Sequence, residues 1–152
     1  MSEEIFGAVQ KLPVNGTKKQ VVLQCAPLLT GIKLSNLLNV RSDQKEEVLR
    51  IFEGSPVCCR VLYEFQGRLS ILLYRPGMLA AYLEREDVKK LMTSFGYENP
   101  DLEETLNRIA DAYQDHMNGK RGFPHEIGLV LGYPPVDVEG FIEKEGRDFL
   151  YS

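Results

Sequence analysis

The residues best suited to chemistry lie near the C-terminus, where His125 and Glu126 are neighbours in the segment 123–142. An imidazole and a carboxylate together could act as an acid–base pair or bind a metal ion. On a helix, adjacent side chains diverge by about 100°, which disfavours a direct pair. A zinc-binding His-Glu-x-x-His motif would need a second histidine at position 129, which is Leu129. The sequence therefore leaves His125 as a general base or ligand acting alone, with Glu126 as a second candidate catalytic residue.

Three further residues complete a candidate ligand-binding set with His125. Lys33 follows a glycine turn near an expected helix start, a setting that can hold an anion. Arg75 continues the apolar face of an expected β-hairpin but is charged, so it would either end the strand at solvent or pair with an acid or a ligand. Tyr133 lies at the turn after Gly132, and its ring is apolar while its hydroxyl is polar. We therefore predict ligand binding by Lys33, Arg75, His125 and Tyr133.

No cofactor and no metal site is expected. The chain has no glycine-rich phosphate loop, no nucleophile elbow and no carboxylates at metal-ligand spacing. Its cysteines, Cys25, Cys58 and Cys59, form no C-x-x-C pair, so a structural zinc site is not predicted. An odd number of cysteines also argues against a disulfide framework, and we interpret all three as packing residues.

The composition is that of one soluble globular domain over residues 1–152. Of the 152 residues, 43% are hydrophobic and 26% are charged. The formal net charge of -4 disfavours nucleic acid and anionic membranes as partners. No apolar run approaches the roughly 18 residues that a membrane span needs, and the acidic N-terminus lacks the basic and apolar regions of a signal peptide. A cytoplasmic location is expected.

Strands are expected early and helices late, which predicts an α+β fold with a small antiparallel sheet, built on a central β-hairpin and packed by several helices. The apolar run 21–26 favours a strand, although a run this short leaves a helix open. A short helix is expected over residues 35–38. Asp43 and Asp101 are each expected to begin a clearer helix, because a glutamate follows three residues later in a capping-box spacing.

The expected hairpin covers residues 57–75, where apolar residues alternate on both strands. A two-residue turn would place Phe65 opposite Arg68, whereas a three-residue loop over 66–68 places Phe65 opposite Leu69. Only the longer loop keeps one face apolar along its whole length. Because burial of a face decides the register, we predict the longer loop.

The last part of the chain predicts a C-terminal helix-turn-helix-like pair. Pro124 suits the first turn of the first helix, Gly132 suits its end, and a second helix is expected over 135–145. Gly128, Gly132 and Val138 have relative spacings of 0, 4 and 10, which match the packing positions of DNA-binding helix-turn-helix units. The second helix is acidic, however, whereas base recognition needs Arg, Lys, Asn or Gln. Nucleic-acid binding is therefore disfavoured.

The segment from Phe123 to Ile142 resembles an uncharacterised bacterial family, domain of unknown function 3793. The shared pattern is F-P-H-E-I-G-x-x-L-G-Y-P-x-x-D-V-x-G-F-I. A second match lies at 25–33 (Cys-Ala-Pro leading to Gly-Ile-Lys), and a third, looser one lies at 73–76 (Leu-Tyr-Arg-Pro) and 96–97 (Gly-Tyr), so the resemblance spans most of the chain. Members often continue into an aromatic Gly-Tyr-Trp-Lys tail, whereas this chain ends in Leu-Tyr-Ser. The resemblance implies no assigned activity.

Two hypotheses of function follow. The first is a soluble cytoplasmic binding or interaction module for a small ligand or a protein, because polar residues lie at the ends of elements while catalytic signatures are absent from the sequence. The alternative is a small enzyme that acts on an anionic small molecule, with His125 as general base and Lys33 or Arg75 holding the anion. The enzyme hypothesis requires these side chains to converge on one site.

Overall fold

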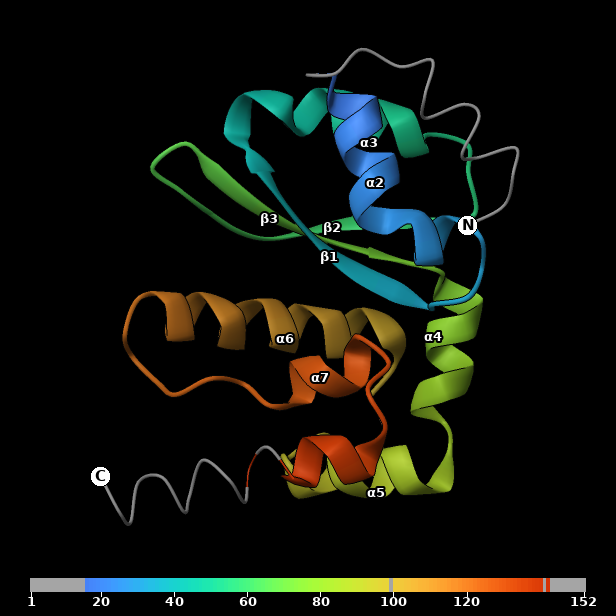
Figure 1. The fold of residues 1–152 in the computed structure, drawn as a ribbon. Helices are drawn as coiled ribbons and strands as arrows, with labels where there is room; N and C mark the ends of the chain where they lie inside the picture. The colour runs from blue at the N-terminus through green and yellow to red at the C-terminus, as the bar shows by residue number, and fades with distance from the viewer. Residues whose placement is uncertain (1–15, 99, 141, 143–152) are drawn as a thin grey trace. The chain divides into compact units, whose positions relative to one another are not determined.

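The computed structural model describes residues 16–98, 100–140 and 142, and it confirms an α+β fold with a small antiparallel sheet (Figure 1). The chain divides into two compact units, Met1–Pro76 and Gly77–Ser152. The single domain expected over residues 1–152 stays a prediction. In chain order the elements are α2 (Thr17–Leu29), β1 (Ser35–Arg41), the 3₁₀ turn η1 (Ser42–Gln44), α3 (Lys45–Phe52), β2 (Cys58–Phe65), β3 (Arg68–Tyr74), α4 (Pro76–Leu83), α5 (Glu86–Ser94), α6 (Leu102–Met117) and α7 (Glu126–Val130).

The first unit is a three-stranded sheet in the order β1-β3-β2, with both strand pairs antiparallel. Helices α2 and α3 lie on the same face of this sheet (Figure 1). Their apolar side chains and those of the strands form one buried cluster, whose removal from water stabilises the unit. The cluster consists of Val21, Cys25, Leu28, Leu38, Val40, Val48, Phe52, Val57, Leu69, Ile71 and Leu73.

Helix α2 replaces the strand that the run 21–26 favoured. Its buried residues Val21, Cys25 and Leu28 follow one another at intervals of four and three residues, so they line one side of a helix. The strand prediction was wrong because the last of these residues lies beyond Pro27, and Pro27 is inside the helix rather than at its end. The short run 21–26 begins with β-branched residues, which favour a strand, and it is too short to show the helical period.

Two further predictions for the first unit need correction. Residues 35–38 begin the strand β1 instead of a short helix, and alternate residues of β1 enter the core. The helix expected from Asp43 begins two residues later, as α3, without a side-chain cap. The turn before it is held by Gln44, whose Oε1 accepts a hydrogen bond from the Arg41 N–H at 3.0 Å. The helix was therefore predicted correctly, but its cap was not.

The β2–β3 hairpin has a two-residue turn, Gln66–Gly67, so the predicted three-residue loop was wrong. Both turn residues have positive φ, 51° and 76°, as a type I′ turn requires. Next to the turn, Phe65 is opposite Arg68. Farther along, a β-bulge shifts the register, and Val61 pairs with Ile71. The bulge brings apolar residues back opposite one another, which the turn alone would not do.

Helices of the second unit begin and end where local rules place them. Asp101 caps α6, since its Oδ1 accepts the Glu104 N–H at 2.7 Å. Helices α5, α6 and α7 each end at a glycine with positive φ, namely Gly96, Gly119 and Gly132. At each glycine, two backbone N–H groups bond back to the last turn in a Schellman arrangement.

After α7 the chain turns sharply, and residues 135–140 are helical again. Gly128 of α7 faces Val138 of this stretch, and a β-carbon at Gly128 would lie 3.1 Å from Val138 Cγ2. The missing side chain therefore allows the two segments to approach closely. Because the expected second helix continues into residues that are not described, the helix-turn-helix-like pair stays a prediction.

Candidate functional site

The predicted ligand-binding residues fall in two different units. Lys33 and Arg75 belong to the unit Met1–Pro76, whereas His125, Glu126 and Tyr133 belong to the unit Gly77–Ser152. Each group is therefore considered within its own unit. A common site for all of them stays a prediction.

In the first unit, Arg75 completes the C-terminal end of α2. Its Nε donates to Leu28 O at 3.0 Å, and its Nη2 donates to Leu29 O at 3.1 Å. The last carbonyls of a helix have no partner inside the helix, and they are the negative end of its dipole. The guanidinium thus satisfies both the hydrogen bonding and the charge of this helix end. Its observed contacts give Arg75 a structural role.

Lys33 lies in the same turn, four residues after the end of α2. The turn contains Gly31 with φ 80°, and the backbone N–H of Lys33 donates to Pro27 O at 2.9 Å. The sequence argument placed Lys33 near a helix start, where N–H groups attract anions. Instead it follows a helix C-terminus, whose exposed groups are carbonyls. The anion argument for Lys33 loses its basis, and ligand binding by Lys33 stays a prediction.

In the second unit, Glu126 is a buried carboxylate that ties three segments together. The residue is 4% exposed. Its Oε2 accepts a hydrogen bond from Tyr97 OH at 3.0 Å, and its Oε1 lies 3.8 Å from Arg121 Nη2. A buried charge is costly unless it is paired and hydrogen-bonded, and Glu126 has both kinds of partner. The carboxylate therefore positions Tyr97 and Arg121.

Tyr97 is held from two sides. Its hydroxyl contacts Glu126, and the Arg108 guanidinium lies 4.0 Å from the centroid of its ring. Arg108 is fixed in turn by donating to Gly96 O at 3.0 Å. Burial, and then the nearby charge of Glu126, raises the pKa of the Tyr97 phenol. Tyr97 therefore keeps its proton and its position as the hydrogen-bond donor to Glu126.

His125 points to a different partner from its neighbour Glu126. Its ring meets Phe123 edge-on, with 5.7 Å between the ring centroids. Phe123 is also in edge contact with His116, with 5.4 Å between the ring centroids. His116 Nδ1 lies 3.3 Å from Arg121 O, so in this contact Nδ1 carries the hydrogen. The only two histidines of the chain therefore flank one phenylalanine.

We call residues 116–126 the α6–α7 junction. Phe123 is 44% exposed there, although it is held by two aromatic neighbours. Residues 116–125 contain Lys120, Arg121 and the two histidines but no acidic residue. In a chain of net charge -4, this segment is a local concentration of cationic and imidazole groups around an exposed ring.

Tyr133 lies at the turn after α7 and is partly exposed. Its carbonyl oxygen accepts a hydrogen bond from Tyr82 OH at 2.8 Å, and its N–H donates to Gly128 O at 2.9 Å. These two bonds connect the turn to α4 and to α7. The observed contacts of the Tyr133 backbone are structural, and a ligand role for its side chain stays a prediction.

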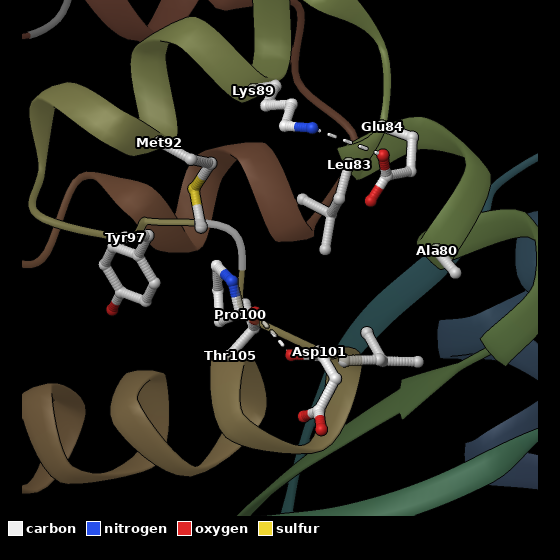
Figure 2. Close-up of a pocket in the computed structure, with 10 residues that line it drawn as sticks. Ala80, Leu83, Glu84, Lys89, Met92, Tyr97, Pro100, Asp101 and Thr105 are labelled. Atoms are coloured by element: carbon white, nitrogen blue, oxygen red, sulfur yellow. Dashed lines mark hydrogen bonds and ion pairs between the residues drawn. The ribbon is translucent and has the colours of Figure 1, made fainter.

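A small cavity lies beside the junction network (Figure 2). It has a volume of about 100 Å³ and is bounded by the end of α4, by α5 and by the start of α6. Tyr97 forms part of its wall, so Glu126 of the C-terminal motif acts on the cavity through the Tyr97 hydroxyl. His125 is not among the residues that line it.

Sequence reasoning missed Tyr97, Arg108, Arg121 and Phe123. A burial argument could have raised the question, because a carboxylate inside the Ile127 and Val130 stripe needs a partner. The partner itself could not be found this way, because Tyr97 precedes Glu126 by 29 residues. Nothing in the local sequence indicated that the Phe123 ring would contact the rings of both His116 and His125.

Neither a metal-binding cluster nor a membrane-spanning helix is present among the described residues. In that part of the chain no group of three or more His, Cys, Asp or Glu residues is placed to hold a metal ion. Within the same residues, no helix is both long and apolar enough to cross a membrane.

Comparison with known proteins places the chain by its sequence. Residues 21–152 match the model of a family described as "Protein of unknown function (DUF3793)". No curated protein and no solved structure was found to match the chain. The family match covers both units and includes every residue of the α6–α7 junction.

Proposed function

The chain belongs to the family of proteins of unknown function DUF3793, and we propose that it is a cytoplasmic binding module that holds an aromatic anion at the α6–α7 junction. One observation carries the proposal. Phe123 is exposed, yet it is fixed between the rings of His116 and His125. An exposed aromatic ring held in place offers contact area at little cost in side-chain entropy.

The charge of the junction selects an anion. Lys120 and Arg121 adjoin Phe123, and the one carboxylate of the junction, Glu126, lies 3.8 Å from Arg121 and so balances one of these two cations. Glu126 is buried, and its carboxylate is hydrogen-bonded by Tyr97. The Arg121 side chain is 43% exposed, and a guanidinium has five N–H donors in a fork that matches carboxylate and phosphate groups. A ligand with one ring and one anionic group fits this arrangement.

The enzyme hypothesis receives less support from the geometry. A general-base histidine is commonly oriented by a carboxylate. The nearest carboxylate in the sequence, Glu126, is directed to Tyr97 and Arg121 instead. Nucleic-acid binding remains disfavoured, because Asp137 and Glu139 are exposed on the helical stretch 135–140. Both alternatives stay hypotheses.

The thiols support a reducing compartment. Cys58 is exposed, Cys59 is partly exposed and Cys25 is buried, and all three are free. Burial, followed by the neighbouring thiols, raises the pKa of Cys59 to about 11. Accessible free cysteines persist where glutathione and thioredoxin keep thiols reduced. This is the basis for proposing the cytoplasm.

The two histidines allow a direct test by NMR, because each contributes one imidazole Cε1–H signal that a His→Gln variant assigns. Phenyl phosphate is the probe, with phenol and inorganic phosphate as the uncharged and ringless controls. We expect phenyl phosphate to shift both histidine signals saturably and more strongly than either control. Absence of a shift at millimolar phenyl phosphate would overturn the proposal.

Matched variants separate the ring from the charge. Phe123→Leu and Lys120→Gln should each weaken phenyl phosphate binding several-fold, because they remove the aromatic surface and one cation. Lys90→Gln, an exposed lysine on α5, is the control and should leave the affinity unchanged. Equal affinities for all three variants would show that binding, if observed, lies elsewhere.

A further inference from the structure

The cavity next to Tyr97 is partly open to solvent, and apolar groups make up the larger part of its lining. The apolar contribution comes from Ala80, Leu83, Met92, the Tyr97 ring, Pro100 and Leu102, and the polar contribution from Glu84, Lys89, Asp101 and Thr105. Lys89 Nζ lies 3.6 Å from Glu84 Oε2, and a dashed line marks this ion pair in Figure 2. The ion pair adds no net charge, and the remaining charged group of the lining, the Asp101 carboxylate, accepts the Glu104 N–H at the start of α6.

The polar atoms around the cavity already have partners. Tyr97 OH donates to Glu126, Thr105 Oγ1 donates to Asp101 O at 2.9 Å, and Asp101 Oδ1 caps α6. Among the described residues, the buried side-chain atom without a hydrogen-bond partner is Ser42 Oγ, which belongs to the first unit. Nothing in the lining therefore requires a water or a polar ligand.

The walls are held apart by contacts outside the cavity. Tyr97 is fixed by Glu126 and by Arg108 on its ring, so it cannot turn inward to fill the space without losing both contacts. Asp101 is fixed by capping α6. Protein interiors contain few voids larger than a water molecule, because side chains normally close them. Here the closing movement is opposed by a buried carboxylate.

We infer that this cavity is a binding site for a small uncharged apolar molecule or the apolar end of a larger one. An engineered cavity of about 150 Å³ lined by similar residues stays dry and binds benzene. A cavity of about 100 Å³ suits a branched group of roughly four or five heavy atoms on the same scale. The site is distinct from the exposed part of the α6–α7 junction around Phe123, which it meets only through the hydrogen bond from Tyr97 to the buried Glu126.

Met92 provides the readout. The chain contains four methionines, so a ¹³C-methyl-methionine spectrum has four signals, and Met92 lines the cavity. Isobutanol is the probe and isobutylammonium is its charged counterpart of the same shape. We expect isobutanol to shift the Met92 methyl signal saturably, at least ten times more tightly than isobutylammonium, with the other methionines unaffected. Uniform small shifts of all methionine signals would overturn the inference.

Two alanines of α4 form a matched pair. Ala80 lines the cavity, whereas the next residue, Ala81, is exposed. Ala80→Leu fills the space and should abolish the saturable Met92 shift, whereas Ala81→Leu adds the same atoms outside and should preserve it. Saturable binding that survives Ala80→Leu would contradict the site. If Ala80→Leu fails to fold, the preference for isobutanol over isobutylammonium in the wild-type protein decides the question.

This outcome is independent of the junction. Isobutanol should leave both histidine signals in place, and phenyl phosphate should leave the Met92 signal in place. Probes that each move the other site's signals would show that the two sites are one.

Discussion

Arg75 lies at the C-terminal end of α2, and Arg121 lies between α6 and α7. The two arginines differ in what their guanidinium groups contact. Two nitrogens of Arg75 donate hydrogen bonds to the final carbonyls of α2, at 3.0 and 3.1 Å. Arg121 lies 3.8 Å from the buried carboxylate of Glu126 and remains 43% exposed. The Arg75 guanidinium is hydrogen-bonded to the backbone. The Arg121 guanidinium balances the buried charge of Glu126 and is also in contact with solvent.

This difference shows why a charged residue at the end of an element is weak evidence of a ligand site. The helix C-terminus next to Arg75 has a fixed demand for hydrogen bonds and positive charge. Arg121 also follows a helix C-terminus, that of α6, but its guanidinium contacts the Gly122 carbonyl at 3.4 Å and the Glu126 carboxylate at 3.8 Å rather than the last carbonyls of the helix. Four substitutions test the contrast, two in the network of Glu126, one at Arg75 and one between α7 and the stretch that follows it.

The largest effect is expected from Glu126→Ala. The substitution leaves the Tyr97 hydroxyl buried without its acceptor, removes the partner of Arg121 and opens a void. Because Arg121 is 43% exposed, the main costs are the unsatisfied Tyr97 hydroxyl and the void, together about 2 kcal/mol or more. Urea unfolding should show this loss, while Glu139→Ala, at an exposed position, should change stability by less than about 0.5 kcal/mol. A loss below about 1 kcal/mol for Glu126→Ala would mean that the carboxylate does not hold the network together.

The next effect is expected from Arg75→Ala, at about 1.5 kcal/mol. It removes two hydrogen bonds from a charged donor, which leaves the Leu29 carbonyl without this partner and the Leu28 carbonyl with only the Gly31 N–H at 3.1 Å. Amide hydrogen exchange should increase in the last turn of α2. Arg75→Lys keeps the charge but not the two-point contact, so it should recover less than half of the loss. Loss of phenyl phosphate binding in Arg75→Ala, with α2 intact, would contradict the structural role assigned to Arg75.

The sequence was sufficient wherever one local rule decided the structure. The N-cap at Asp101 and the helix end at Gly132 were both predicted, because capping and left-handed glycine geometry depend on residues a few positions apart. The α+β class followed from the order of the patterns. These features need no knowledge of the rest of the fold.

The predictions failed where distant residues decide. The hairpin register depends on a bulge between Val61 and Tyr63, and no local pattern marks a bulge that compensates for a turn. Helix α2 was missed because Leu28, which reveals its period, lies beyond Pro27. The divergence of His125 and Glu126 followed from helix geometry, but the partner of Glu126 is Tyr97, 29 residues earlier. Only the folded chain brings these groups together.

Gly128→Ala is expected to lower the free energy of unfolding by a smaller amount, about 1 kcal/mol. The new β-carbon would lie 3.1 Å from Val138 Cγ2. Alanine favours the helix by about 1 kcal/mol relative to glycine, and the cost of the crowding is larger than this gain. In a Val138→Ala background the same substitution should be neutral or stabilising, a coupling of at least about 0.5 kcal/mol. Gly140→Ala is the control, because no atom lies within 4 Å of its β-carbon. Additive effects of Gly128→Ala and Val138→Ala in urea unfolding would show that the two segments do not pack at this point.

The smallest effect is a difference in pH dependence between the wild type and Tyr97→Phe. Burial and the charge of Glu126 raise the pKa of Tyr97 in the folded protein, whereas a tyrosine in the unfolded chain titrates near 10. Above that pH the unfolded chain releases a proton that the folded protein retains, so the free energy of unfolding falls as pH rises toward the folded pKa. The loss amounts to about 0.8 kcal/mol at roughly pH 10.5. Tyr97→Phe lacks this proton, so its stability should fall less steeply between about pH 9.5 and 10.5. The other titrating groups are common to both proteins and cancel in the comparison of their urea unfolding curves. Equal slopes would show that the Tyr97 hydroxyl is not held in a buried contact with the Glu126 carboxylate.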